Sequence, residues 1–154
     1  MRHMKINNFA GRPATIVALI RFFFGVPSTM KALVLVAHGS RRQTSNEEVI
    51  TLSGVIAREM KDDYPIVEAG FLELAEPSIP EAIDCCVRQG ATDICIVPYF
   101  LSAGRHVHED IPGEIDKARA MHTHTAMTIL PHIGGSPHMK ELIRDVVREG
   151  GHTG

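Results

Sequence analysis

Histidines and carboxylates follow several apolar runs of this 154-residue chain, at the points where those runs end. His38 directly follows one run, and Glu73 and Glu76 follow a second. His106 comes shortly after a third. Parallel strands bring their carboxyl ends to one edge of a sheet, where ligands bind, so we expect these side chains to lie close together. The sequence therefore predicts a cluster of histidine and carboxylate at one sheet edge.

Such a cluster is suited to a divalent transition metal. Two neutral imidazoles and a carboxylate supply nitrogen and oxygen donors for Co²⁺, Fe²⁺, Ni²⁺ or Zn²⁺. No cysteine neighbours these residues in the sequence, which argues against a structural zinc or an iron–sulfur centre. With three or fewer protein ligands, coordination positions stay open. The predicted site therefore either passes a metal on or activates a molecule that the metal binds.

Each predicted ligand also has a purely structural interpretation. His38 could hydrogen-bond a neighbouring carbonyl in its turn. Glu73 could be a salt-bridged structural acid, because an unpaired carboxylate beside an apolar core is costly. Glu76 could start a turn and cap the next helix as readily as it could bind a substrate.

Two further histidines, His108 and His132, lie near the same strand ends. His108 shares a face with His106 if the intervening segment is extended, and points away from it if the segment is helical. The sequence leaves open whether either of them joins the site.

The elements that would position these residues alternate regularly from residue 30 onward. Apolar runs of strand length cover residues 31–37, 65–72, 93–100 and 126–130, and helical apolar spacing covers residues 46–60, 79–90, 112–121 and 137–148. Strands separated by single helices predict an α/β domain with a four-stranded, mostly parallel open sheet and flanking helices. The apolar runs are unbroken, so we expect each strand to be buried on both faces.

The composition excludes several classes of protein. A formal net charge of −2, with 44% apolar and 22% charged residues, is typical of one soluble domain. The chain has no Trp and two Tyr, and it is not basic, so we expect no nucleic-acid partner. The three cysteines lack C-x-x-C spacing, which predicts reduced thiols and a cytoplasmic protein.

Residues 1–29 differ from the rest of the chain. They carry four basic residues and no acidic ones, whereas the other 125 residues hold 12 basic against 18 acidic. Their apolar run at residues 14–26 is interrupted by Arg21 and falls short of the roughly 20 residues that span a bilayer, so we expect no membrane partner. We interpret residues 1–29 as an N-terminal extension, disordered or due to an upstream start, and residues 30–154 as a single domain. A basic surface helix and an organellar presequence remain alternatives.

Two turns are suited to anions. Residues 39–40 and 134–136 each lead towards a predicted helix N-terminus, where free amides and the helix dipole favour carboxylates. Three arginines flank the histidines: Arg41, Arg42 and Arg105. The phosphate-loop and G-x-S-x-G motifs are absent, which argues against nucleotide-driven and serine-hydrolase chemistry. A polyanionic substrate beside a bound metal fits this edge.

Three long motifs carry a resemblance to a known family. The stretches LVLVAHGSRR, GFLELAEPSIPEAI and IVPYFLSAGRHVHEDIP occur in this order. They are similar to the short sirohydrochlorin chelatases, the class II cobaltochelatases and ferrochelatases that insert a divalent metal into a tetrapyrrole. The resemblance spans residues 30 to about 148. It implies a chelatase-like half-module, related to ferrochelatase, whose homodimer restores the two-domain enzyme.

The resemblance also implies roles for particular residues. His38, Glu73 and His106 would be the metal ligands, with His38 and His106 catalytic and His38 or Glu76 accepting pyrrolic protons. Together with Ser40 and Arg41 of the first anion turn, the residues expected to contact the tetrapyrrole are Glu76, Leu101, Ser102, Ala103, Gly104, Arg105 and His106.

The predicted function is that of a lyase which inserts a divalent metal into sirohydrochlorin without ATP, in cobalamin or sirohaem biosynthesis. Co²⁺ is the first expectation for the metal, with Fe²⁺ or Ni²⁺ next. The metal is a substrate, and no tightly bound cofactor is expected. The main alternative is a non-catalytic metallochaperone or tetrapyrrole-binding carrier, and a metal-dependent hydrolase is a third interpretation.

Overall fold

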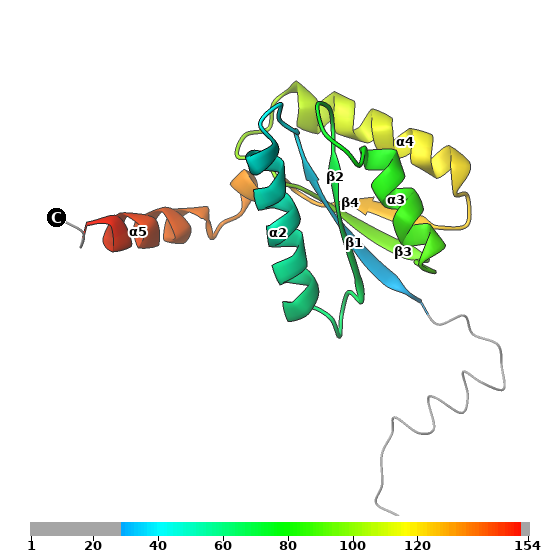
Figure 1. Cartoon of the computed structure of the whole chain (residues 1–154), viewed down its shortest axis with the longest axis horizontal. Helices are drawn as coiled ribbons and strands as arrows, with labels where there is room; N and C mark the ends of the chain where they lie inside the picture. The colour runs from blue at the N-terminus through cyan, green and yellow to red at the C-terminus, as the bar shows by residue number, and fades with distance from the viewer. Residues whose placement is uncertain (1–28, 152–154) are drawn as a thin grey trace, which may run out of the picture.

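The strands and helices alternate along the described chain. A computed structural model of the protein describes residues 29–151. Its elements, shown in Figure 1, are β1 (Lys31–Ala37), α2 (Gln43–Glu59), β2 (Ile66–Phe71), α3 (Ile79–Arg88), β3 (Asp93–Pro98), η1 (His106–Asp110), α4 (Ile111–Met121), β4 (Ala126–Ile129), η2 (Ile133–Gly135) and α5 (Met139–Gly150). The expected extension over residues 1–29 lies, but for residue 29, outside the described residues.

The four strands form one sheet in the order β2-β1-β3-β4, and every pairing is parallel. The predicted α/β class is confirmed, and the mostly parallel sheet is entirely parallel. Right-handed crossovers place α2 on one face of the sheet and α3 and α4 on the other, as Figure 1 shows. All four carboxyl ends consequently lie at one edge.

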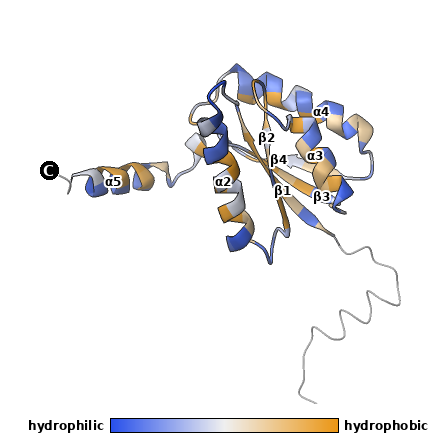
Figure 2. Ribbon diagram, in the orientation of Figure 1, coloured by the Kyte–Doolittle hydropathy of each residue, from blue (hydrophilic) through white to orange (hydrophobic). Residues whose placement is uncertain are grey.

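The main core lies between the sheet and helices α3 and α4. Ile94 and Ile96 of β3 are fully buried there, as are Ile83 of α3 and Ile115 of α4. Figure 2 shows the strands as the most hydrophobic elements and the outer helix faces as hydrophilic. The unbroken apolar runs of the sequence therefore correspond to the strands.

Helix α3 begins at a capping box. The backbone N–H and the hydroxyl of Ser78 both donate to the Glu81 carboxylate, at 2.8 and 2.7 Å. The interpretation of Glu76 as the cap of this helix is therefore wrong, because Ser78 is the N-cap residue. This pairing satisfies the backbone N–H of Ser78, the residue at which the helix is capped.

The sheet face under α2 is only half covered. On this face α2 packs on β2 and β1. The other described helices pack mainly on the opposite face or away from the sheet, which leaves this side of β3 and β4 largely uncovered. Cys95 and Val97 of β3 are consequently half-buried on that side, and Thr128, paired with Cys95, is exposed. The expectation that each strand is buried on both faces is wrong for β3 and β4, because a strand's second face needs a covering helix.

Helix α5 extends away from the sheet (Figure 1). It starts and ends two residues later than predicted, and residues 140–150 are exposed. Its apolar side chains are among them, with exposed fractions from 55% at Leu142 to 67% at Val147. The predicted amphipathic helix is present, but its apolar side does not pack on the chain's own core.

The three cysteines are free thiols. Cys86 is buried in the core, and this burial raises its pKa to about 12. Cys85 and Cys95 are partly exposed. In the part of the chain that the structure describes, no helix has both the length and the apolar character needed to cross a bilayer.

Replacing Ile96 by Ala should leave a cavity in the core, because this side chain is fully buried on an inner strand. The expected loss in the free energy of unfolding is about 2–5 kcal/mol, measured by urea denaturation. The control Ile50→Ala removes the same atoms from α2, where the side chain is 47% exposed. The control should change stability by no more than about 0.5 kcal/mol. Equal losses in the two variants would contradict the placement of the core.

Candidate functional site

Three segments bring His38, Glu73 and His106 together at the carboxyl edge of the sheet. His38 follows β1, Glu73 follows β2 and His106 opens η1 after β3. Nε2 of His38 lies 3.1 Å from Oε1 of Glu73. The two imidazole rings meet edge to face, with centroids 4.7 Å apart and planes at 81°. The three residues expected to act together are therefore neighbours.

The turn after β1 makes this contact by a close backbone approach. Gly39 has a φ of +89°, in the left-handed region that favours glycine. A Cβ at this position would lie 1.8 Å from the backbone oxygen of Glu73. The backbone N–H of Glu73 donates to the carbonyl of His38 at 3.0 Å. A glycine is thus required for the end of β1 to meet the segment after β2.

Ser40 stabilises the remainder of this turn. Its hydroxyl accepts the backbone N–H of Arg42 at 3.0 Å, and its carbonyl accepts the Asn46 side chain at 2.8 Å. Arg41 and Arg42 are exposed immediately before helix α2. The first of the two turns predicted to suit anions therefore combines a helix N-terminus with two exposed cations.

The hydrogen bonds of His38 indicate where its ring protons lie. Its Nδ1 is 3.1 Å from the carbonyl of Gly39, and because a carbonyl only accepts, we assign the ring proton to Nδ1. In the neutral ring, Nε2 then directs a lone pair at the carboxylate of Glu73. Two facing acceptors suit a proton or a metal cation between them.

His106 is oriented by a residue that the sequence reasoning missed. Its Nδ1 is 2.8 Å from Oδ2 of Asp110, across one turn of the π-helix η1. This bond places the Nδ1 proton against the carboxylate and leaves the Nε2 lone pair available. Metal-binding histidines commonly have such a carboxylate partner. The four-residue spacing was the available signal, but the helix was predicted to start only at Pro112.

The segment after β3 also separates the neighbouring histidines. Because η1 is helical, His108 does not share the face of His106, and it is exposed. The ring of His132 faces Gly135 in the loop around η2, about 3.0 Å from where a Cβ would be. Neither residue contacts His38, Glu73 or His106 through any interaction that we observe in the described chain.

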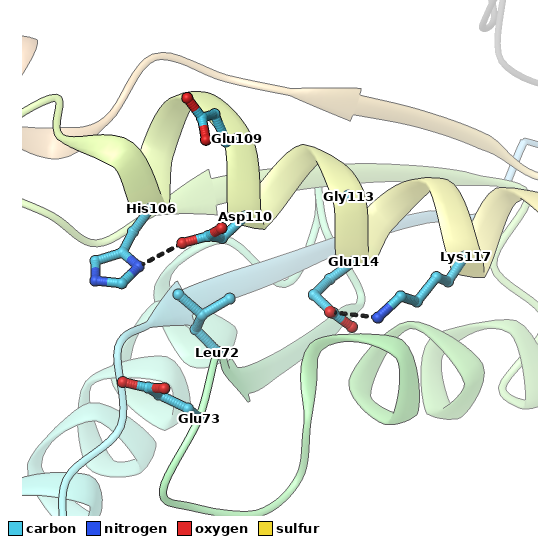
Figure 3. A pocket seen from close by; sticks show the side chains of 8 residues that line it. All are labelled: Leu72, Glu73, His106, Glu109, Asp110, Gly113, Glu114 and Lys117. Carbon is cyan, nitrogen blue, oxygen red and sulfur yellow. Dashed lines mark hydrogen bonds and ion pairs between the residues drawn. The ribbon is translucent and has the colours of Figure 1, made fainter.

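A hollow of about 430 Å³ opens beside His106 (Figure 3). Its lining residues are Leu72, Glu73, His106, Glu109, Asp110, Gly113, Glu114 and Lys117. Lys117 pairs with Glu114 at 2.6 Å, and Arg105 lies 3.4 Å from Glu109 at the rim. Four carboxylates against one lining cation make the hollow acidic, so it attracts cations rather than carboxylates.

Glu76 lies apart from this hollow. It lines a second one of about 550 Å³ with Glu81 and Asp84. A hydrogen bond with the Glu81 carboxyl raises the pKa of Glu76, and the like charge of Glu81 adds to the effect. Leu101 to Arg105 form an exposed loop after β3, next to His106.

The second turn expected to suit anions does not have free amides. The backbone N–H of Gly134 donates to Phe100, that of Gly135 to His132 and that of Ser136 to Ile133. Helix α5 begins three residues after this turn, at Met139, rather than directly on it. The expectation of an anion site at residues 134–136 is therefore wrong, since its donors are already bonded.

The trio can do two chemical tasks. It offers two imidazole Nε2 atoms and a carboxylate to a cation, and His38 and Glu73 are close enough to share a proton. It is partly open to solvent, with side-chain exposures of 40%, 53% and 44%. Within residues 29–151, no three His, Cys, Asp or Glu side chains are grouped so as to enclose a metal ion as they stand. The site as described is therefore open.

Known proteins share both the sequence and the fold of this chain. A sirohydrochlorin ferrochelatase of Arabidopsis thaliana chloroplasts is 40% identical over 120 residues, which cover 76% of this chain and 49% of the relative. A sirohydrochlorin cobaltochelatase of Methanocaldococcus jannaschii is 45% identical over 83 residues, covering 54% of this chain and 57% of the relative. The chain thus spans about half the length of these curated relatives.

Among solved structures, SirB from Bacillus subtilis with Fe³⁺ superposes with a TM-score of 0.72 at 28% identity, covering 80% of this chain and 48% of SirB. A CbiX protein of Marinobacter aquaeolei has a TM-score of 0.65 at 32% identity, covering 78% of this chain and 96% of that one. The CbiX family model matches residues 32–150, which include β1 from its second residue, the other three strands in full and all three members of the trio. The chain therefore belongs to the CbiX family.

Proposed function

We propose that this chain inserts a divalent metal ion into sirohydrochlorin, without a nucleotide. The observation that carries the proposal is the meeting of His38, Glu73 and His106 from three strand ends, with Nε2 of His38 3.1 Å from Glu73. Its further support is that the relatives are named sirohydrochlorin cobaltochelatase and ferrochelatase. Co²⁺ is the proposed first choice of metal, with Fe²⁺ or Ni²⁺ next.

The metal would bind to the Nε2 atoms of His38 and His106 and to the carboxylate of Glu73. Both imidazoles are held through Nδ1, by Gly39 and Asp110, so each can offer Nε2 without losing its support. Small side-chain rotations would close the trio around the ion. The acidic hollow beside His106 would guide the hydrated cation to it.

Metal insertion releases two protons, since M²⁺ replaces the two pyrrolic hydrogens of the macrocycle. His38 and Glu73 are a histidine and a carboxylate in direct contact, so the pair can accept a proton and pass it to solvent. In the described chain, Glu73 rather than Glu76 is the carboxylate beside His38. As the ion leaves the trio for the macrocycle, these side chains regain the capacity to bind protons.

The carboxylate arms of sirohydrochlorin need a cationic surface. The turn from Ser40 to Arg42 offers two exposed arginines at the N-terminus of α2, next to His38. The exposed loop from Leu101 to Arg105 borders the other histidine. We place the tetrapyrrole across these two segments, with the acidic hollow on the side from which the metal enters. Glu76 remains a candidate contact at the periphery.

We further propose that the chain acts as a cytoplasmic homodimer in which residues 30–154 form one chelatase domain. The proposal of a dimer is supported by the length of the chain: it covers 48% of SirB, so two copies would supply the length of that longer chain. The proposal of a cytoplasmic location is supported by the three cysteines, which are free thiols. Cobalamin and sirohaem synthesis are the two proposed pathways.

An absorbance assay tests the activity. Purified protein is mixed anaerobically with sirohydrochlorin and Co²⁺ or Fe²⁺, and the spectrum of the metallated product is followed. We expect acceleration over the uncatalysed rate, and a loss of kcat/KM of roughly 100-fold or more in His106→Ala. The control His124→Ala, at an exposed loop residue, should match the wild type. Tight binding of metal or pigment without acceleration would instead indicate a carrier.

Asp110→Asn tests the support of His106. The substitution keeps the shape of the side chain but removes the charge that orients the imidazole, so we expect metal affinity to fall by about 10- to 100-fold. The measurement is Co²⁺ titration by calorimetry, with the kinetic KM for the metal as a second readout. Asp116→Asn, at an exposed position of α4, is the matched control. An unchanged Kd for Co²⁺ in Asp110→Asn would show that this hydrogen bond does not support a metal ligand.

A further inference from the structure

Leu74, directly after Glu73, has a strained backbone conformation. Among residues 29–151 it is the one residue other than glycine with a positive φ, and its value of 63° lies in the left-handed region, where the Cβ of an L-residue crowds the following carbonyl. Glycine or asparagine would form the same turn at lower cost. Leu74 is also 53% exposed, so burial within the described chain offsets only part of this cost. A strained leucine that the fold uses so little is a candidate for contact with a ligand.

Hydrogen bonds on both sides hold Leu74 in this conformation. Before it, the backbone N–H of Glu73 donates to the carbonyl of His38 at 3.0 Å. After it, the carbonyl of Pro77 accepts the backbone N–H of Phe71 at 2.8 Å, which closes the loop between them. The surrounding structure therefore fixes a conformation that a leucine disfavours. Because the same loop carries Glu73, the position of Leu74 is tied to that of a proposed metal ligand.

A second exposed leucine lies after the neighbouring strand on the other side of β1. Leu101 is 77% exposed, the highest fraction among the large apolar residues of the described chain. Its backbone is held against Gly134, where a Cβ would lie 1.9 Å from the Leu101 carbonyl oxygen. The backbone N–H of Gly134 also donates to the carbonyl of Phe100 at 2.9 Å. Leu74 and Leu101 are therefore both exposed side chains on firmly held backbones.

The two leucines flank the end of β1, where His38 lies. Leu74 comes three residues after β2 and Leu101 three residues after β3, and β1 runs between these two strands. Neighbouring strands are about 4.8 Å apart, so the ends of β2 and β3 are about 10 Å apart. One large flat ring can contact both leucines across His38, whereas a small acid or a phosphate cannot.

We propose that Leu74 and Leu101 are the apolar contacts of the tetrapyrrole ring, one on each side of His38. This inference rests on the proposed function and deepens it, because it names what holds the ring. Leu74 was not among the residues expected from the sequence to contact the tetrapyrrole. Its place next to Glu73 means that one short segment brings the ring and a proposed metal ligand together.

The two parts of sirohydrochlorin need different partners. Its carboxylate arms surround a flat conjugated ring, whose faces are apolar. The exposed cations Arg41 and Arg42 suit the arms, and the two leucines suit the ring. Sites for small molecules commonly combine apolar contacts with a few polar groups that fix the orientation of the ligand.

Titration of the protein with sirohydrochlorin, without metal, tests the contact. Leu74→Asn introduces a residue that tolerates the left-handed conformation and replaces an apolar side chain by a polar one of similar size. We expect the Kd for sirohydrochlorin to rise about 10-fold, because one leucine contact is lost, while the Kd for Co²⁺ stays unchanged. Leu74→Met keeps an apolar side chain and should remain within about threefold of the wild type. The matched control Met121→Asn removes a similarly exposed apolar side chain, at 62%, from the far end of α4 and should bind as the wild type does.

Three further measurements separate a ligand contact from a structural role. Leu74→Gly removes both the side chain and the backbone strain, so its urea midpoint should equal or exceed that of the wild type while its affinity for sirohydrochlorin falls. Added salt should narrow the difference between Arg41→Gln and the wild type, since that contact is ionic, but not the difference between Leu74→Asn and the wild type. Leu74→Asn combined with Leu101→Asn should raise the Kd about 100-fold, because two separate contacts add in free energy.

An unchanged Kd for sirohydrochlorin in Leu74→Asn overturns the inference, even where metal insertion by the wild type supports the proposed function. A clearly lower urea midpoint in Leu74→Gly also overturns it, because the side chain would then serve the fold. A wild type that does not bind sirohydrochlorin overturns both the inference and the proposed function. Binding with the expected loss in Leu74→Asn, but without acceleration of metal insertion by the wild type, refutes the proposed function alone.

Discussion

The close approach of Gly39 to the backbone of Glu73 determines the rest of the site. At this point the central strand β1 ends against the segment that follows β2, with no room for a side chain. The backbone N–H of Glu73 donates to the carbonyl of His38, with 3.0 Å between nitrogen and oxygen, and this hydrogen bond holds the two backbones together. The imidazole of His38 and the carboxylate of Glu73 extend from these two backbones and are therefore in contact. On its other side β1 pairs with β3, from whose carboxyl end the loop to His106 starts.

The carboxyl edge carries opposite charges on its two sides. The turn from Ser40 to Arg42 is cationic, and the hollow beside His106 is lined by four carboxylates. This separation suits the proposed reaction between a polyanionic macrocycle and a cation, because each reactant would be repelled from the other's surface. The body of the chain is acidic overall, so the cationic turn is a local feature.

Local pattern in the sequence was enough to predict the four strands, their helices and the meeting of His38 with Glu73 and His106. These depend on periodicity and on the rule that parallel strands end together. The remaining features do not follow from these two rules. Asp110 was missed because η1 is helical before Pro112, where proline was taken as the first helical residue. The amides of residues 134–136 were expected to be free, but Gly134 donates to Phe100 in another segment, and Gly135 and Ser136 donate to carbonyls three residues earlier. The partial burial of Val97 and the exposure of Leu142 were missed because an apolar pattern shows which side chains need burial and not what buries them.

The proposed homodimer has a consequence for how such chains can diverge. All three proposed ligands lie on one chain, so in that dimer two copies would hold two identical sets of ligands for a macrocycle that takes up one ion. Joining the copies into one polypeptide, of the length of SirB, would remove the identity between the sets. One set could then lose its histidines and serve only to bind the tetrapyrrole, while the other set kept the metal ligands. A homodimer has no such freedom, because every substitution in its gene changes both halves at once.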